Sequence, residues 1–331
     1  MTATPLLQVR DVVQEFAVRG AGGVKGGVVH AVSGVSFDIH AGETLGVVGE
    51  TGSGKSTLAR SVVQAPRPKS GEVLFQGTDL VGLRRRALVA ARRDLQMVYQ
   101  DPYGSLNPRW RVGELVEEPL IGYGAGAAAR RRERVRELLD LVGLDPSVYG
   151  DRRPHQLSGG QCQRVAIARA LALDPALIVC DEAVSSLDVL IQAQVLNLFE
   201  RLRREFDLSY LFISHDLALV KQISDRVAVM HLGELAEVAR AQELYRRPLH
   251  PYSAALLDSI PGLDPATGRT RRPAPPRGEP PSPITPPSGC RFRTRCPYAQ
   301  QRCADERPLP REAAPGHQVA CHFPLTHEPR A

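Results

Sequence analysis

The chain carries short, continuous apolar runs that are separated by longer amphipathic stretches. Five such runs lie at residues 44–48, 95–99, 177–180, 210–213 and 226–230. Strands that are apolar throughout, rather than alternately, are typical of a parallel sheet whose two faces are both covered by helices. We therefore expect an α/β body.

The pattern changes between about residues 101 and 160, where helical periodicity replaces the apolar runs. One helix is predicted over residues 131–144. Its apolar side chains form a single stripe of Val135, Leu138, Leu139 and Val142. The segment is predicted to be a mainly helical subdomain inserted into the α/β body.

Composition separates the end of the chain from this body. Residues 261–289 are rich in Pro, Gly, Ser and Arg, which predicts a semi-extended linker with little helix or sheet. Four of the six cysteines follow within residues 290–331. The expected divisions are thus a body over residues 1–260, a Pro-rich linker over 261–289 and a Cys-rich segment over 290–331.

The net charge of +6 is unevenly spread, because residues 262–331 carry +5 of it. A nearly neutral body argues against nucleic acid as a partner. The sequence has no run of 18 or more apolar residues and no basic start followed by an apolar stretch, so we expect neither a membrane span nor a secretory signal. The cytoplasm is then the expected compartment, where thiols stay reduced or bind metal.

A phosphate-binding motif of the form G-x-x-x-x-G-K-S follows the first apolar run and precedes a predicted helix that starts near Thr57. Its residues are Gly49, Glu50, Thr51, Gly52, Ser53, Gly54, Lys55 and Ser56. Glycines let successive backbone N–H groups face phosphate oxygens, and a helix N-terminus adds partial positive charge. Lys55 is expected to reach the β- and γ-phosphates and Ser56 to ligate Mg²⁺.

An acidic pair ends the strand predicted over residues 177–180. Asp181 is placed to hold Mg²⁺ through water, and the carboxylate of Glu182 is placed to polarise the attacking water. The alternative is a solvated acidic pair at a strand end; the phosphate motif upstream favours the catalytic interpretation.

A third motif resembles the signature of ATP-binding cassette (ABC) proteins: Leu157, Ser158, Gly159, Gly160 and Gln161. The other motifs of that family follow in order over about residues 5–260. Gln100 matches the Q-loop, Asp181 and Glu182 match Walker B and the catalytic carboxylate, and His215 matches the switch histidine. The D-loop is matched by Ser186, Leu187 and Asp188. Phe16 matches the aromatic residue that stacks on adenine.

The resemblance implies an ABC-type P-loop ATPase with a RecA-like parallel-sheet core, an N-terminal antiparallel β subdomain, an inserted helical signature subdomain and a small Cys-rich tail. It assigns catalysis to Glu182, His215 and Gln100, and Mg²⁺ to Ser56, Gln100 and Asp181. It assigns ATP binding to Phe16, Gln100 and residues 49–57. The signature residues are implied to contact the ATP of a second ATPase subunit, which is expected to be a paralogue.

The branch of the family follows from spacing and from two further segments. About a hundred residues without heptads separate the phosphate motif from the signature, which excludes the repair type with its long coiled coil. A single cassette excludes the ribosome-associated type. Residues 100–108 and 250–257 resemble the Q-loop and the following helix of oligopeptide and dipeptide importer ATPases.

The implied activity is ATP hydrolysis that drives import across the cytoplasmic membrane from its cytoplasmic face. The implied partners are two transmembrane permease subunits and, indirectly, a substrate-binding protein. Nickel, glutathione or another small solute remains an alternative cargo. A soluble ABC ATPase that acts as a regulatory or interaction module is a second alternative.

The cysteines of the tail have the spacing C-x5-C-x6-C-x17-C, over Cys290, Cys296, Cys303 and Cys321. Four thiolates can hold a [4Fe–4S] cluster or a zinc ion. Zinc ribbons favour tighter C-x2–4-C pairs, and the wider spacing resembles the iron–sulfur tail of some peptide-importer ATPases. The cluster is therefore favoured, with zinc, unligated thiols or disulfides as alternatives. Cys162 and Cys180 are expected to be ordinary buried thiols.

Overall fold

The computed structural model describes residues 4–18, 26–259 and 278–326. The chain forms two compact units, and neither is continuous in sequence. The first unit comprises Thr4, Ile39–Glu43 and Gly82–Ile213. The second comprises the described parts of Pro5–Asp38, Thr44–Val81 and Ser214–Ala331. These units are defined by contacts in space and do not test boundaries along the sequence. The boundaries expected at residues 260 and 290 therefore stay predictions.

Three parallel strands form the sheet of the first unit: β6 (Leu95–Val98), β7 (Leu177–Asp181) and β8 (Ser209–Ile213). Leu95 pairs with Leu177, which in turn pairs with Ser209. Every residue of β7 and β8 is buried. The continuous apolar runs therefore form parallel strands, as the pattern predicts.

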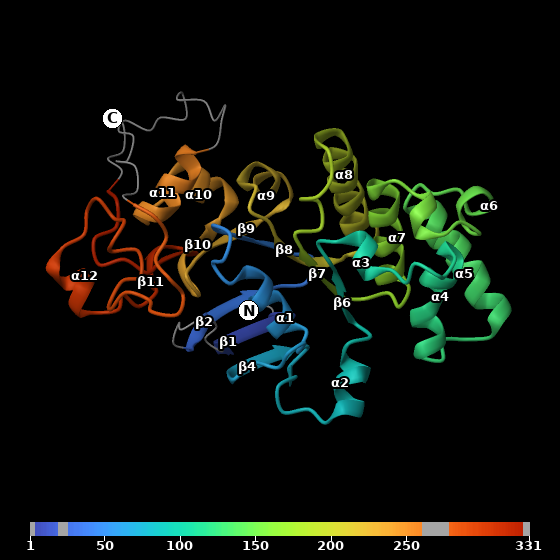
Figure 1. Ribbon diagram of the computed structural model, residues 1–331, viewed down its shortest axis with the longest axis horizontal. Coiled ribbons are helices and arrows are strands. Elements are labelled where there is room, and N and C mark those ends of the chain that lie inside the picture. The colour runs from blue at the N-terminus through green and yellow to red at the C-terminus, as the bar shows by residue number, and fades with distance from the viewer. Residues whose placement is uncertain (1–3, 19–25, 260–277, 327–331) are drawn as a thin grey trace. The chain divides into compact units, whose positions relative to one another are not determined.

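Between β6 and β7 the described chain forms helices and no strand (Figure 1). These elements are α3 (Pro102–Ser105), α4 (Val112–Gly122), α5 (Ala128–Leu141), α6 (Pro146–Tyr149), a 3-10 helix (Pro154–Gln156) and α7 (Gly159–Leu171). The predicted stripe of α5 is confirmed, because all four of its apolar residues are buried. The helix starts three residues earlier than predicted and ends before Val142. The first unit also contains α2 (Arg85–Ala91) and α8 (Val189–Phe206).

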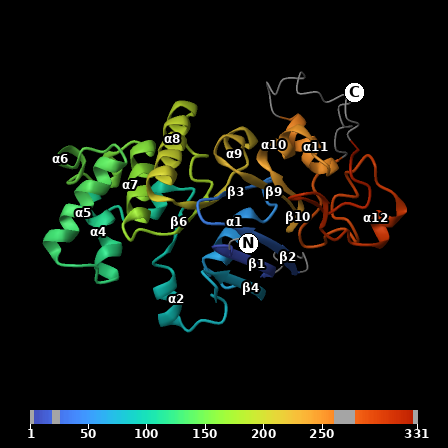
Figure 2. The same ribbon diagram turned by 180° about the vertical axis from the view of Figure 1, so that it is seen from behind.

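The second unit contains two sheets. One is an antiparallel sheet with the order β2-β1-β4-β5, formed by β1 (Leu7–Val18), β2 (Gly27–Ile39), β4 (Ser70–Phe75) and β5 (Thr78–Asp79). It confirms the expected N-terminal β subdomain, and β1, β2 and β4 lie side by side in Figures 1 and 2.

The other sheet begins with two parallel strands, β3 (Thr44–Val48) and β9 (Arg226–His231). It continues with antiparallel partners β10 (Glu234–Arg240), β12 (His317–Val319) and β11 (Arg311–Ala314). The hairpin of β11 and β12 was not predicted from the sequence. It joins residues 311–319 to the sheet that carries β3, so the Cys-rich segment is integrated into this unit.

The helices of the second unit are α1 (Lys55–Val62), α9 (Leu217–Ile223), α10 (Ala241–Arg246), α11 (Pro251–Asp258) and α12 (Gln301–Asp305). Helices α10 and α11 pack on β10 (Figure 2). Residues 278–289 of the predicted linker contain no helix or strand. They are nevertheless attached, since the His30 N–H donates to the Pro283 carbonyl at 3.0 Å.

Among the described residues, no helix has both the length and the apolar character needed to cross a lipid bilayer.

Candidate functional site

The phosphate loop leaves β3 and enters α1, as the motif requires. Two of its glycines are needed because the backbone passes close to other chain segments. A Cβ atom on Gly49 would lie 2.1 Å from the Met230 carbonyl oxygen, and one on Gly54, whose φ is 105°, would lie 2.0 Å from that of Ala31. A side chain at either position would displace backbone rather than another side chain. The loop therefore takes its shape from packing against β2 and β9.

Lys55 lies across this loop and is 4% exposed. Its Nζ donates to the carbonyl oxygens of Gly49 at 2.7 Å and Glu50 at 3.0 Å, and to Ser53 Oγ at 3.5 Å. The ammonium group thus lies beside the N-terminus of α1. The N-cap of this helix is Gly54, so no side chain caps its first N–H groups. The arrangement concentrates positive charge where an anion can bind.

Glu50 has contacts that the sequence did not suggest. Its N–H donates to Tyr252 Oη at 2.9 Å. Arg295 Nη1 donates to its two carboxylate oxygens at 3.0 and 2.8 Å. The phosphate loop is therefore bonded to α11 and to the Cys-rich segment.

The acidic pair lies in the first unit at the end of β7. Asp181 is 3% exposed. Glu182 has a φ of 51°, a strained value for a residue with a side chain, and its N–H donates to the Ile213 carbonyl at 3.0 Å. Gln100 Nε2 donates to Glu182 Oε2 at 2.9 Å, and Ser186 Oγ donates to the Gln100 carbonyl at 3.3 Å. The structure thus brings together the predicted Q-loop, catalytic carboxylate and D-loop.

The signature begins α7, also in the first unit. Ser158 caps the helix: its Oγ accepts the Gln161 N–H at 3.3 Å, and the Gln161 Oε1 accepts the Ser158 N–H at 2.9 Å. A Cβ atom on Gly160 would lie 2.4 Å from Ile191 Cγ2 of α8. Leu157 is buried, whereas Ser158 is exposed at the helix N-terminus. The motif therefore presents a hydroxyl and helix N–H groups at the surface of this unit.

The remaining predicted site residues are distributed between the units. His215 and Phe16 belong to the second unit, as the phosphate loop does, and both are exposed. In the first unit, Asp188 of the D-loop caps α8, since its Oδ1 accepts the Ile191 N–H at 3.0 Å. Gln100, Asp181, Glu182 and the signature lie in that unit. Each unit therefore carries one part of the predicted nucleotide site.

The four tail cysteines line one pocket in the second unit, together with Phe292 and His250. Burial, as the largest cause, and the neighbouring thiols together raise the pKa of the Cys290 thiol to about 11 and that of Cys321 to about 12. All six cysteines are free thiols, and Cys162 and Cys180 are buried as expected. Among the described residues there is no group of three or more His, Cys, Asp or Glu side chains that could hold a metal ion.

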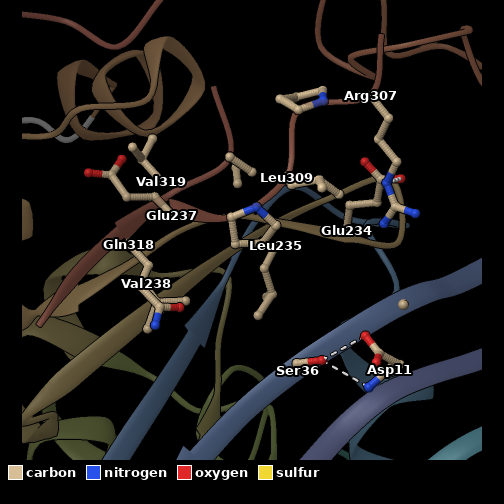
Figure 3. A pocket seen from close by; sticks show the side chains of 15 residues that line it. Asp11, Ser36, Glu234, Leu235, Glu237, Val238, Arg307, Leu309, Gln318 and Val319 are labelled. Carbon is tan, nitrogen blue, oxygen red and sulfur yellow. Dashed lines mark hydrogen bonds and ion pairs between the residues drawn. The ribbon is translucent and has the colours of Figure 1, made fainter. Parts of the chain in front are cut away.

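A further pocket of about 160 Å³ lies where residues 307–310 and 318–320 meet β10 (Figure 3). Arg307 and Glu234 both line it, with Arg307 Nε 2.9 Å from Glu234 Oε1. Arg291, which does not line the pocket, has its Nε 3.1 Å from the same oxygen. Burial raises the pKa of Glu234, and the two guanidinium groups oppose that rise. Deeper in the sheet, Glu237 accepts hydrogen bonds from the N–H groups of residues 249 and 250 and contacts His317 at 2.6 Å. These contacts anchor the Cys-rich segment to β10.

The comparisons with known proteins agree with this fold and these motifs. The ABC transporter family matches residues 32–185, and the family of the oligopeptide/dipeptide transporter C-terminal region matches residues 236–303. The ATP-binding cassette MJ0796, solved as a dimer in a post-hydrolysis state with ADP and Pi, is 30% identical with a TM-score of 0.63, covering 71% of this chain and 98% of that one.

Curated relatives extend the similarity over nearly the whole chain. The oligopeptide transport ATP-binding protein AppF of Bacillus subtilis is 50% identical over 96% of this chain and 97% of its own. OppF of Salmonella typhimurium, which bears the same description, is 50% identical over 88% and 87%. The chain therefore belongs to the ABC transporter family, in the branch of oligopeptide transport ATP-binding proteins. It is an ATPase that uses ATP and Mg²⁺.

Proposed function

We propose that this ATPase energises the import of oligopeptides or dipeptides, working as a peripheral subunit on the cytoplasmic face of the cell membrane. The observation that carries the proposal is the match of residues 236–303 to the peptide-transporter C-terminal region, together with identity of about half to peptide transport ATPases. The structure supports the proposal because the described residues of that region belong to the same compact unit as the phosphate loop. Two permeases and a substrate-binding protein are the corresponding partners.

The proposed binding half is the phosphate loop of the second unit. Residues 49–57 would surround the triphosphate, with Lys55 exchanging its carbonyl contacts for phosphate oxygens and Phe16 stacking on the base. His215 would contact the γ-phosphate. The support is the buried ammonium group beside a helix N-terminus that lacks a side-chain cap.

The proposed hydrolytic half lies in the first unit. Glu182 would take or orient the proton of the attacking water, and Gln100, which already bonds its carboxylate, would position both. Ser56, Asp181 and Gln100 would hold Mg²⁺, since hydroxyl, carboxylate and amide oxygens are the ligands this ion prefers. Bound Mg²⁺ would supply charge neutralisation on the phosphates.

The signature is proposed to act on a neighbouring subunit. Ser158 and the backbone of Gly159 and Gly160 offer donors at an exposed helix N-terminus, which suits a γ-phosphate held by a second cassette. Leu157, Gln161 and the D-loop residues Ser186, Leu187 and Asp188 would border that contact. We propose that the second cassette is a paralogue, so that the ATPase pair is a heterodimer.

The four tail cysteines are proposed to hold a [4Fe–4S] cluster, with zinc as the alternative. The support is that the four thiols line one pocket and affect each other's pKa. Four thiolates on one tetrahedral zinc lie about 3.8 Å apart, whereas each cluster thiolate binds a separate iron and can be further away. Anaerobic purification tests this: a brown protein with about four irons per chain is expected, and a colourless protein with one zinc would contradict it.

The cargo is tested in proteoliposomes that contain the assembled importer and its substrate-binding protein. Uptake of a labelled oligopeptide or dipeptide is expected to require ATP and to stop with Glu182→Gln. Uptake of nickel or glutathione, with none of peptide, would assign the alternative cargo. Purification of the chain without polytopic partners from detergent extracts would favour a regulatory module instead.

A further inference from the structure

Glu50 is the point at which the phosphate loop is bonded to the C-terminal part of its own unit. Three of its groups are engaged: the N–H with Tyr252 Oη, the carbonyl with Lys55 Nζ and the carboxylate with Arg295. Lys55 is itself part of the loop. Tyr252 and Arg295 are therefore the two residues that bond Glu50 from outside the loop. Both come from segments that follow the last predicted nucleotide motif at His215.

Arg295 is buried to an extent that is unusual for an arginine, with 8% of its surface exposed. Its Nη1 contacts both oxygens of the Glu50 carboxylate, and its guanidinium group lies 6.0 Å from the ring centre of Phe292. Its Nε has no hydrogen-bond partner among the described residues. The position of this buried charge is therefore determined mainly by Glu50.

Tyr252 is fixed as firmly as Arg295. It is 1% exposed, and its ring packs against His231 at 4.4 Å and Phe292 at 5.3 Å between ring centres. Phe292 is 2% exposed and lies two residues after Cys290. The hydroxyl that accepts the Glu50 N–H is thus supported by an aromatic cluster shared by β9, α11 and the Cys-rich segment.

The charges give this arrangement a consequence for nucleotide binding. A carboxylate beside a loop that binds a triphosphate repels the ligand, and the repulsion is strong where water is partly excluded. Arg295 offsets the charge of Glu50, while Tyr252 fixes the backbone at the same residue. Both effects favour the bound nucleotide without any contact to it.

We propose that Arg295 and Tyr252 are positioning residues of the phosphate loop, acting through Glu50, so that the Cys-rich segment contributes to nucleotide affinity. The proposal rests on the assignment of residues 49–56 as the nucleotide-binding loop. That assignment has its own test: Lys55→Ala should abolish MgATP binding by the full-length chain. Retained binding would remove the loop assignment, whatever the Arg295 variants do.

The test compares variants in the assembled importer by the KM for ATP and kcat. Arg295→Met, which keeps length and removes charge, should raise KM about tenfold by leaving the Glu50 carboxylate unneutralised, with kcat changed less than twofold. In a Glu50→Gln background the same substitution should change KM less than twofold. Arg293→Met is the matched control, because Arg293 lies in the same segment and bonds Ser288 instead.

Two results would overturn the proposal. One is an unchanged KM in a folded Arg295→Met protein. The other is an equal rise of KM in the Glu50→Gln background, which would show that Arg295 acts by packing alone. If Arg295→Met does not fold, Tyr252→Phe is the deciding variant. It removes the hydroxyl that accepts the Glu50 N–H, so the KM for ATP should rise about threefold. An unchanged KM would contradict the proposal.

Discussion

The phosphate loop and the signature are both proposed to hold phosphate, yet they are supported in different ways. The cap of the signature is local, because Ser158 and Gln161 satisfy each other three residues apart. The phosphate loop is bonded through Glu50 to Arg295, which is 245 residues away in sequence. The cap of the signature is thus formed by residues of the motif itself, whereas the hydrogen bonds of Glu50 in the phosphate loop come from distant segments of the same unit.

The largest effect is expected from Glu182→Gln, which should slow ATP hydrolysis while leaving ATP binding nearly unchanged. Glu182→Gln removes the carboxylate that orients water, so kcat should fall about 10²- to 10⁴-fold. The affinity for MgATP should stay within about twofold of wild type, because the phosphate loop is intact. Measurements are steady-state hydrolysis in the importer and equilibrium nucleotide binding.

Glu137→Gln serves as the control for Glu182→Gln, since Glu137 lies on the exposed face of α5 and pairs with Arg134 at 3.2 Å. Undiminished hydrolysis in Glu182→Gln would remove that residue from its proposed role.

Acid is expected to destabilise the phosphate-loop unit through two buried histidines. Burial lowers the pKa of His250 to about 4 and that of His231 to about 3. Because the unfolded chain takes up these protons near pH 6.5 and the folded chain does not, stability is full above about pH 6.5 and falls as pH drops toward 4, by roughly 1 kcal/mol per pH unit for each histidine.

His250→Asn tests this dependence in thermal melts between pH 7 and pH 4. Asparagine can replace the Nδ1 cap of α11, which accepts the Tyr252 N–H at 3.0 Å, but it does not titrate. The variant should therefore lose less stability in acid than wild type. An unchanged pH profile would mean that His250 does not contribute.

The signature should be sensitive to local crowding. Gly160→Ala places a methyl group against Ile191 of α8, so the free energy of unfolding should fall by about 1–3 kcal/mol. Ile191→Ala should cost less stability in the Gly160→Ala background than in wild type, because it removes the atom that the new methyl group approaches. Chemical denaturation measures both, and additive losses would show that the two sites are independent.

The smallest effect is expected from the signature cap. Ser158→Ala removes the acceptor for the Gln161 N–H and should lower the free energy of unfolding by about 1 kcal/mol. Ser158→Asp should restore the cap and thus the stability, although not hydrolysis, because a carboxylate would repel a γ-phosphate. A similar melting temperature for Ser158→Ala and wild type would contradict the role of the cap.

The sequence was most informative where chemistry and local structure coincide. The phosphate loop and the acidic pair each follow a strand and precede a helix, and the signature opens a helix, so their residue types and their elements could be predicted together. The contact between Gln100 and Glu182 was not predicted; it arises because both residues come after neighbouring parallel strands.

The rest depends on contacts that have no local signal. Glu50 and Arg295 are common residue types far apart in the chain, and neither position is apolar or periodic. The β11–β12 hairpin has strands of four and three residues, and Arg311–Ala314 is exposed throughout. Such short strands form because a sheet edge is present, and the sequence alone does not reveal that edge.

The contact between Glu50 and Arg295 also sets an order of events during protein synthesis. A ribosome adds about 5–20 residues per second, so 245 residues correspond to roughly 12–50 s between the two side chains. During that interval the phosphate loop has left the ribosome without its guanidinium partner. On the proposed role of Arg295, nucleotide binding at full strength therefore requires the chain to have been made through residue 295.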